Sequence, residues 1–367
     1  MRVWQKIVLG FVFAVLLVVI GGVAYGTKAY YDLKATASQT YESVERISET
    51  KRSEEVDYSS LEPISILLMG VDTDVERTEE GDTGRTDSMM VVTINPGTGQ
   101  TTMVSIPRDT LVEMDYQYGD VYIQYDKINA AYAYGGAALA MKTVEDLLDI
   151  PIDHYATVNM DGMADLIDAV GGVTVNNAFA FDLNMEHFDE GELQLNGKRA
   201  VEYARMRYED PNGDYGRQER QREVLEQLFN QITSVGTLSN YQNLLDVLGE
   251  NGKTDLDWST ISSLVQNYTP ALSNFVTDQL QGVDYTGDGY IGESGISFQQ
   301  VTEEEIIRVQ NLLKEQLNEA TITELASDYP DLEVLADSYT TSTYGTTSDT
   351  YTYGNDTTYD DSTSYGY

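Results

Sequence analysis

The chain has 367 residues, of which 22 are Lys or Arg and 61 are Asp or Glu, so its formal net charge is −39. An acidic surface of this kind repels the phosphate backbone of nucleic acids, which argues against nucleic-acid binding. The hydrophobic fraction of 41% is enough for a packed core, so the chain as a whole is not disordered. The absence of cysteine excludes disulfides, thiolate metal sites and a cysteine nucleophile.

The N-terminus carries the signal of a membrane anchor. Residues 7–24 are an unbroken run of apolar residues and glycine, preceded by Arg2 and Lys6. As a helix this run is about 27 Å long, close to the thickness of the bilayer hydrocarbon. A short positive N-terminus tends to stay inside the cell, so we expect residues 1–6 in the cytoplasm, a single-pass anchor over residues 7–26 in the cell membrane, and the rest of the chain outside. A cleaved signal peptide is the alternative, but the apolar run is longer than a usual signal core.

The remaining chain divides by composition. We expect a polar, helical stalk over residues 27–62, a domain over 63–235, a C-terminal part of that domain over 236–335, and a disordered tail rich in Tyr, Thr, Ser and Asp over 336–367. Apolar runs predict strands at residues 64–69, 88–94, 101–106 and 154–159. Helical patterns cover residues 137–148, 161–170, 216–233, 254–268 and 301–317. Alternation of the two patterns is typical of an α/β domain.

Basic residues are scarce in this chain, and many of them cluster. Seven lie within 25 residues: Lys198, Arg199, Arg205, Arg207, Arg217, Arg220 and Arg222. A charge run is usually a solvated helix face, but arginine outnumbers lysine here, and guanidinium binds phosphate through two hydrogen bonds. If residues 205–207 are extended, Arg205 and Arg207 point to one side, while Arg217, Arg220 and Gln221 share a helix face. This arrangement predicts an anionic ligand.

A second group of charged residues lies at the ends of predicted strands. Asp72 follows the first strand, Arg85 and Asp87 precede the second, and Arg108 follows the third. Ligands of open α/β sheets bind outside the carboxyl ends of the strands. Carboxylates next to arginines suit a Mg²⁺ ion that bridges phosphate oxygens. Each short motif taken alone is more often a turn or a salt bridge.

The order of these motifs resembles the LytR-CpsA-Psr family over residues 63 to about 235. The resemblance rests on the segments 66–72 (ILLMGVD), 84–90 (GRTDSMM), 104–110 (VSIPRDT), 127–132 (KINAAY), 170–173 (VGGV), 195–200 (LNGKRA), 203–207 (YARMR) and 216–221 (GRQERQ). It implies an α/β fold with a mixed central β-sheet flanked by helices in three layers, α-β-α, preceded by one transmembrane helix.

The resemblance also implies an activity outside the cell. Members of the family are membrane-anchored phosphotransferases that move a glycopolymer, of teichoic acid or capsular polysaccharide type, from a polyprenyl-pyrophosphate carrier to peptidoglycan. The activity is expected to depend on Mg²⁺ or Mn²⁺, with pyrophosphatase activity as a side reaction. A non-catalytic envelope protein that binds glycopolymers and a transcriptional attenuator are the alternatives, and the charge of −39 opposes contact with DNA.

Roles for individual residues carry over from the matching motifs. Asp87, Arg108 and Asp72 are the predicted catalytic residues, and Asp72 and Asp87 the predicted metal ligands. Asp87 is the first candidate for the general base, and Asp72 the second. The pyrophosphate is expected to contact Arg85, Arg108, Arg205, Arg207, Arg217 and Gln221.

Two further features have competing interpretations. The polyprenyl tail requires an apolar groove, for which Met89, Met90 and Leu166 are candidates, although core packing is the commoner role of such residues. His154 stands at the start of the predicted strand 154–159, where a structural hydrogen bond is favoured over a catalytic role.

Overall fold

The computed structural model describes residues 27–48, 51–52, 54–72, 84–232, 246–247, 249–287 and 295–326. The predicted membrane anchor at residues 7–26 and the predicted tail at 336–367 lie outside the described residues. Within the ranges given above, no helix combines the length and the apolar character needed to cross a bilayer.

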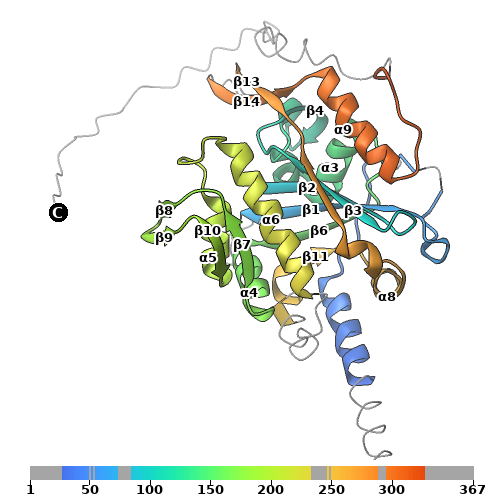
Figure 1. Ribbon diagram of the computed structural model, residues 1–367. Coiled ribbons are helices and arrows are strands. Elements are labelled where there is room, and N and C mark those ends of the chain that lie inside the picture. The colour runs from blue at the N-terminus through green and yellow to red at the C-terminus, as the bar shows by residue number, and fades with distance from the viewer. Residues whose placement is uncertain are drawn as a thin grey trace, which may run out of the picture.

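A six-stranded sheet forms the centre of the described structure, in the order β11-β6-β1-β2-β3-β12. Its strands are β1 (Ile64–Asp72), β2 (Arg85–Asn95), β3 (Gln100–Ile106), β6 (His154–Asn159), β11 (Gly252–Thr254) and β12 (Phe275–Gln279). The pairs β1–β6 and β3–β12 are parallel, and the pairs β1–β2, β2–β3 and β6–β11 are antiparallel. The expected mixed sheet is therefore confirmed, and the late strands β11 and β12 form its two edges (Figure 1).

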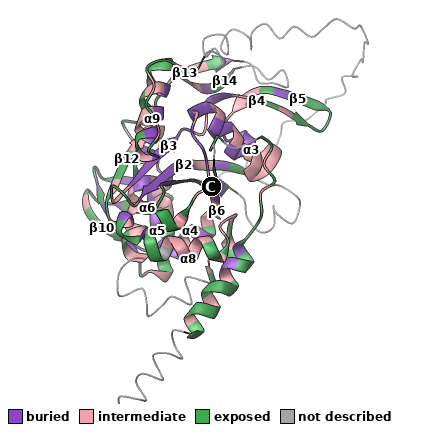
Figure 2. Ribbon diagram, turned by 90° about the vertical axis from the view of Figure 1, so that its right-hand side faces the viewer, coloured by how far each residue is buried: buried purple, intermediate pink, exposed green. Residues whose placement is uncertain are grey.

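Helices flank both faces of this sheet, as expected. The side chains of β1 alternate between the faces: Leu67 and Met69 pack toward α3 (Ala130–Leu148) and α9 (Glu303–Gln316). Ile66 and Leu68 face the opposite side, which is covered by α4 (Met160–Ala169), α5 (Gly197–Arg205), α6 (Asp214–Ile232) and α8 (Trp258–Asn267). Figure 2 shows the central strands β2 and β3 as buried.

The helix boundaries follow local signals. The Thr302 side chain accepts a hydrogen bond from the Glu305 backbone and caps α9, close to its predicted start. The predicted helix 137–148 begins earlier, at Ala130, because α3 consists of two helical pieces joined at Gly135 and Gly136. Gly136 adopts φ 61°, a left-handed conformation that glycine reaches without steric cost, so the apolar periodicity of the first piece is interrupted.

Within the described residues, four two-stranded ribbons and two 3₁₀ turns surround this core. The ribbons pair β4 (Leu111–Tyr118) with β5 (Val121–Lys127), β7 (Val173–Asn177) with β10 (Gly191–Leu195), β8 (Phe181–Leu183) with β9 (Glu186–Phe188), and β13 (Gly282–Gly287) with β14 (Ile296–Val301). The 3₁₀ turns are η1 (Tyr58–Ser60) and η3 (Thr269–Ser273).

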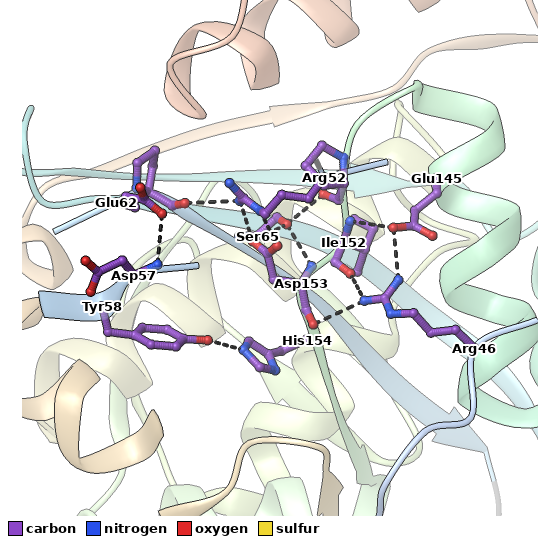
Figure 3. A network of polar contacts seen from close by, with 12 residues as sticks. Arg46, Arg52, Asp57, Tyr58, Glu62, Ser65, Glu145, Ile152, Asp153 and His154 are labelled. Atoms are coloured by element: carbon purple, nitrogen blue, oxygen red, sulfur yellow. Dashed lines mark hydrogen bonds and ion pairs between the residues drawn. The ribbon is translucent and has the colours of Figure 1, made fainter. Parts of the chain in front are cut away.

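Among the described residues of the segment predicted as a helical stalk, an α-helix covers only the first part. Residues 27–40 form a helix, and the following segment runs along the domain (Figure 1). Two arginines attach this segment, as Figure 3 shows: Arg52 binds both carboxylate oxygens of Asp153, at 2.6 and 2.7 Å, and Arg46 lies 3.1 Å from the buried carboxylate of Glu145. These contacts hold Arg46 and Arg52 against the domain.

Candidate active site

The predicted site residues of the strands meet where the central strands β1 and β3 end, which is a different place from the edge strands β11 and β12. β1, β3 and β6 end there, and β2 begins there because it runs antiparallel to β1 and β3. Asp72 is the last residue of β1, Arg108 lies two residues beyond β3, and Arg85 and Asp87 open β2. This is the edge at which open α/β sheets bind ligands.

A β-bulge sets the position of Asp87. Gly70 pairs with Ser88 and Val71 with Thr86, so Asp87 is the extra residue on β2. The bulge leaves Thr86 buried, with its hydroxyl donating to the carbonyl of Asn129 at 3.4 Å, while the Asp87 carboxylate is one-quarter exposed. Asp87 Oδ1 accepts a hydrogen bond of 2.8 Å from Nη1 of Arg108.

Arg108 is held by a chain of alternating charges. Its Nε lies 3.7 Å from Oδ2 of Asp109, and Asp109 Oδ1 accepts a 2.8 Å hydrogen bond from Lys127. Burial by itself lowers the pKa of Arg108, but the carboxylates of Asp87, Asp109 and Asp214 outweigh it, so the pKa of Arg108 is raised. The guanidinium is thus fixed and charged. Sequence reasoning missed the positioning roles of Asp109 and Lys127, although both stand in the motifs that carried the family resemblance.

Two arginines from the helical region join this group through Asp214. Asp214 Oδ1 lies 2.8 Å from Nη2 of Arg217 and 3.5 Å from Nε of Arg207. Burial lowers the pKa of Arg217; Asp214 opposes this shift, and the charge of Arg108 adds to it. Arg108 and Arg217 therefore lie within electrostatic range of each other, and the buried Nε–H of Arg217 has no hydrogen-bond acceptor in the described ranges. We call Asp87, Arg108, Arg207, Asp214 and Arg217 the charged cluster.

Asp214 is the residue of this cluster that the sequence analysis did not select. It occupies the first turn of α6, where a carboxylate also interacts favourably with the helix dipole. Its position three residues before Arg217 is the sequence signal that identifies it, because residues i and i+3 are neighbours on a helix.

The other predicted site residues lie around the cluster. Arg205, at the end of α5, is half exposed and lies 4.0 Å from Glu202. Gln221 of α6 lines an apolar cavity together with Arg205. Asp72 and Arg85 are exposed and are direct partners in the register of β1 and β2. Their predicted roles in catalysis, metal binding and pyrophosphate binding stay predictions.

Arg220 corrects the expectation of a single ligand-facing side of α6. Its guanidinium is buried against the end of α5, where it donates to the carbonyls of Tyr203 and Met206 and pairs with the Asp210 carboxylate. Arg222 is also buried and donates to Ser105 and Gln279. Successive arginines of α6 therefore point to different sides of the helix, and Arg220 joins α5 to α6 instead of facing the charged cluster.

An apolar cavity of about 390 Å³ opens between the sheet and helices α4, α5, α6 and α8. Met90 and Leu166 line it, as the groove interpretation predicted, whereas Met89 points to the opposite face of the sheet and is part of the core. Gly70 and Ser88 also line it, next to the bulge that carries Asp87. The apolar cavity and the charged cluster are therefore neighbours.

Asp72 and Asp87 fit a divalent cation only if waters and substrate phosphates supply its other ligands. No group of three or more His, Asp or Glu side chains with metal-binding geometry occurs in the part of the chain that the structure describes. Mg²⁺ is commonly held by one or two carboxylates together with waters and substrate phosphates. Asp72 and Asp87, on neighbouring strands, are compatible with that mode.

His154 lies at the opposite end of β6, away from the charged cluster. Its Nε2 is hydrogen-bonded to the Tyr58 hydroxyl (Figure 3). Its Nδ1 lies 3.3 Å from Oδ1 of Asp255. These contacts join three distant segments and agree with the structural interpretation of this histidine.

The fold and the site define a mixed α/β protein in which an arginine-rich cluster adjoins a deep apolar cavity. A sequence model of the LytR_cpsA_psr family matches residues 28–315, and the chain belongs to this family. A relative from Enterococcus faecalis, the polyisoprenyl-teichoic acid–peptidoglycan teichoic acid transferase TagU, is 44% identical over 313 residues, which cover 85% of this chain and 96% of the relative.

Solved structures are also similar. A crystal structure of a Streptococcus agalactiae protein has a TM-score of 0.67 and 36% identity, and the match covers 81% of this chain and all of the other. A structure of TagT bound to LIIa-WTA has a TM-score of 0.60 and 27% identity, and it covers 76% of this chain and all of the other.

Proposed function

We propose that the protein transfers a glycopolymer of the teichoic acid type from a polyprenyl-pyrophosphate carrier to peptidoglycan. The observation that carries this proposal is the apolar cavity of about 390 Å³ beside the charged cluster. The two together match a ligand with a long apolar tail and an anionic head. The names of the relatives, a teichoic acid transferase and a TagT bound to LIIa-WTA, support this ligand class.

The lipid tail occupies the cavity between the sheet and α6. Apolar side chains from the strands and from four helices line the cavity, so burying a prenyl chain there removes apolar surface from water. Arg205 and Gln221 are the polar members of its lining on α5 and α6. They bind the phosphate next to the tail, where the lipid changes from apolar to charged.

The charged cluster binds the pyrophosphate. Its three arginines, Arg108, Arg207 and Arg217, carry more positive charge than Asp87 and Asp214 neutralise, and Arg85 extends the positive charge along the sheet edge. Because Asp87, Asp109 and Asp214 hold the arginines in place before the ligand arrives, little reorganisation is needed when negative charge develops. The cluster thereby stabilises both the transferred phosphoryl group and the departing lipid phosphate.

The reaction is a phosphoryl transfer. An acceptor hydroxyl oxygen on peptidoglycan attacks the phosphorus that bears the glycopolymer, the bond from this phosphorus to the bridging oxygen breaks, and polyprenyl phosphate leaves. Asp87 is the first candidate to take the hydroxyl proton, and Asp72 the second. When water replaces the acceptor hydroxyl, the same step gives pyrophosphatase activity.

Asp72 and Asp87 are the residues that would hold Mg²⁺ or Mn²⁺. Such an ion supplies charge neutralisation at the phosphate oxygens. We place the reaction outside the cell, with the chain anchored through residues 7–26. The reason is that the lipid carrier and the peptidoglycan acceptor meet at the outer face of the cell membrane.

The test uses the full-length chain in detergent and two synthetic donors, each a sugar linked through pyrophosphate to a long or a short prenyl tail. Release of prenyl phosphate is measured with a peptidoglycan acceptor. Leu225→Trp, which places a bulky ring in the cavity, should raise the KM for the long-tailed donor more than for the short-tailed donor.

Gln227→Trp is the matched control on the same helix, because Gln227 is not part of the cavity lining. The lipid site is wrong if Leu225→Trp affects both donors equally. A wild-type chain that binds donor but releases no prenyl phosphate, at any Mg²⁺ or Mn²⁺ concentration, would show a binding protein and not a transferase.

A further inference from the structure

A second concave region lies on the other side of α6. It is a trough of about 630 Å³ between α6, the segment that follows β7, and β12. None of its lining residues lines the apolar cavity, because Glu219, Glu223 and Glu226 occupy a different face of α6 from Gln221 and Val224. Figure 1 shows α6 in front of the sheet, with β7 on one side of the helix and β12 on the other. The volume is in the range of about 300–1,000 Å³ that is usual for small-molecule sites.

The trough is negatively charged, in contrast to the charged cluster. Its lining contains five carboxylates, from Asp210, Glu219, Glu223, Glu226 and Asp278, and two guanidiniums, from Arg220 and Arg222. Asp210 pairs with Arg220, and Asp278 pairs with Arg308. Burial, followed by the neighbouring charge of Glu223, raises the pKa of Glu226. A polyanionic glycopolymer is repelled by this surface.

Neutral hydrogen-bonding groups are available in the same trough. Asn176, Asn212 and Gln281 contribute side-chain amides, which donate and accept, and Phe179 contributes a half-buried aromatic ring. Arg222 is 6% exposed, and its Nε–H is buried with no hydrogen-bond acceptor among the described residues. Donors and acceptors beside an aromatic ring suit the hydroxyl and acetamido groups of an uncharged sugar.

The trough leads toward the charged cluster. A smaller cavity of about 310 Å³ shares Asn212, Glu219, Gln279 and Gln281 with it and extends to Tyr215. Tyr215 directly follows Asp214, the carboxylate that holds Arg207 and Arg217. The smaller cavity therefore extends the polar lining to the first turn of α6, which also carries Asp214.

We propose that this trough binds the acceptor, as an uncharged chain of N-acetylhexosamine units. The proposal rests on the proposed transferase function and adds a spatial separation to it. The anionic donor occupies the side of α6 that carries the charged cluster and the apolar cavity, and the neutral acceptor occupies the acidic trough on the other side. Electrostatic repulsion then keeps the donor polymer out of the acceptor site.

The test measures binding without any donor, so it does not depend on catalysis. The full-length chain in detergent is titrated in a calorimeter with N-acetylglucosamine tetramer and, separately, with a glycerol phosphate tetramer. The sugar tetramer should bind, and the phosphate tetramer should not compete with it. The double variant Asn176→Ala, Gln281→Ala should weaken binding of the sugar tetramer about tenfold, from the loss of two hydrogen-bonding side chains.

Gln227→Ala is the matched control, since Gln227 lies on α6 outside the trough, and it should leave the affinity unchanged. Sugar binding that is absent in the wild type, or that survives in the double variant, overturns the proposal. So does displacement of the sugar tetramer by the phosphate tetramer, which would make the trough a site for the donor polymer.

The transfer assay then separates the two proposals. In the double variant, the KM for a peptidoglycan acceptor should rise while the KM for the lipid donor stays constant. Sugar binding with the expected mutational pattern in a chain that never transfers would leave the trough in place and refute the transferase. If the double variant transfers with an unchanged KM for the acceptor, the transferase function stands and the trough is refuted as the acceptor site.

Discussion

Arg108, in the loop that follows β3, and Asp87, on β2, are joined by a 2.8 Å hydrogen bond between side chains that are both about one-quarter exposed. The bond exists because the bulge in β2 places Asp87 at the sheet edge, and because Asp109 and Lys127 hold the other side of Arg108. A pair this accessible contributes little to stability, about 1 kcal/mol or less. Its value lies in orienting two groups toward a ligand.

Arg108→Ala and Asp87→Ala should each remove transfer activity, by about 10²–10³-fold in kcat, while the melting temperature stays within a few degrees of the wild type. The reason is that each loses a preorganised charge at the pyrophosphate, whereas the core is unchanged. Donor turnover and thermal unfolding, measured on the same samples, check this.

Two controls sharpen the result. Arg108→Lys keeps the charge but not the planar fork, so it should recover only part of the activity. If the melting temperature of both alanine variants falls in proportion to the activity that they lose, the pair has a structural role instead.

Arg217 and Arg220 should behave differently, although they are three residues apart on α6. Arg220→Met leaves Asp210 buried without its partner and removes the bonds to two α5 carbonyls, so the free energy of unfolding should fall by about 3–5 kcal/mol. Arg217→Met leaves Asp214 with Arg207 as a partner, and should chiefly raise the KM for the lipid donor. Chemical denaturation and donor kinetics on the pair of variants distinguish the roles, and a reversed pattern would remove Arg217 from the charged cluster.

The sequence predicted the inner strands well, because β1 and the middle of β2 are short apolar runs, and β3 and β6 are short segments rich in β-branched residues between turn signals. It also predicted that charged residues at the ends of these strands share one edge, since that follows from strand direction alone. The predicted helix 216–233 agrees with α6 within two residues at each end, because its amphipathic pattern continues over many residues.

Other features depended on pairing that the sequence does not contain. The bulge at Asp87 arises from the register of β1 against β2, and the short ribbons have too few apolar residues to show a period. The spacing of Arg217 and Arg220 is the same in a solvated face and in a buried joint, so only the position of α5 distinguishes them. Met89 and Met90 look alike in the sequence, but the pleat sends one into the core and the other into the cavity.

Gly197, at the start of α5, should not tolerate a side chain. A Cβ placed there would lie 1.9 Å from the carbonyl oxygen of Ala164, because the first turn of α5 contacts the backbone of α4. Gly197→Ala must push the two helices apart and should cost about 1–3 kcal/mol of stability. The same displacement moves Arg205, at the other end of α5, so activity should fall as well.

The control is Gly99→Ala, at a turn with φ of 66° where a Cβ meets nothing within 4 Å. It carries only the backbone strain of a left-handed residue, about 1–2 kcal/mol, and should leave the kinetics unchanged. Equal activity in both variants would mean that the contact between α4 and α5 does not position Arg205.

Asp149 predicts a specific dependence of stability on pH. Burial by itself raises the pKa of this carboxyl, but hydrogen bonds and attraction from Lys51 and Lys314 outweigh it, so the pKa in the folded state is below the ordinary value of 3.8. A lowered pKa means that the folded state favours the charged form. The contribution of Asp149 to stability is therefore complete well above pH 3.8 and is lost as the pH falls through the folded-state pKa.

Asp149→Asn isolates this contribution, because asparagine also adopts the left-handed conformation that Asp149 has at φ 44°. At neutral pH the variant should be less stable than the wild type, by about 1 kcal/mol or less, since the site is more than one-third exposed. The difference should shrink as the pH falls below 3.8 and through the lowered folded-state pKa, because protonated Asp149 is neutral, as asparagine is at every pH. Urea denaturation at a series of pH values measures it. If the difference in the free energy of unfolding between the wild type and the variant is constant across the pH series, the loss at neutral pH is steric. Lys51 and Lys314 then do not act through the charge of Asp149.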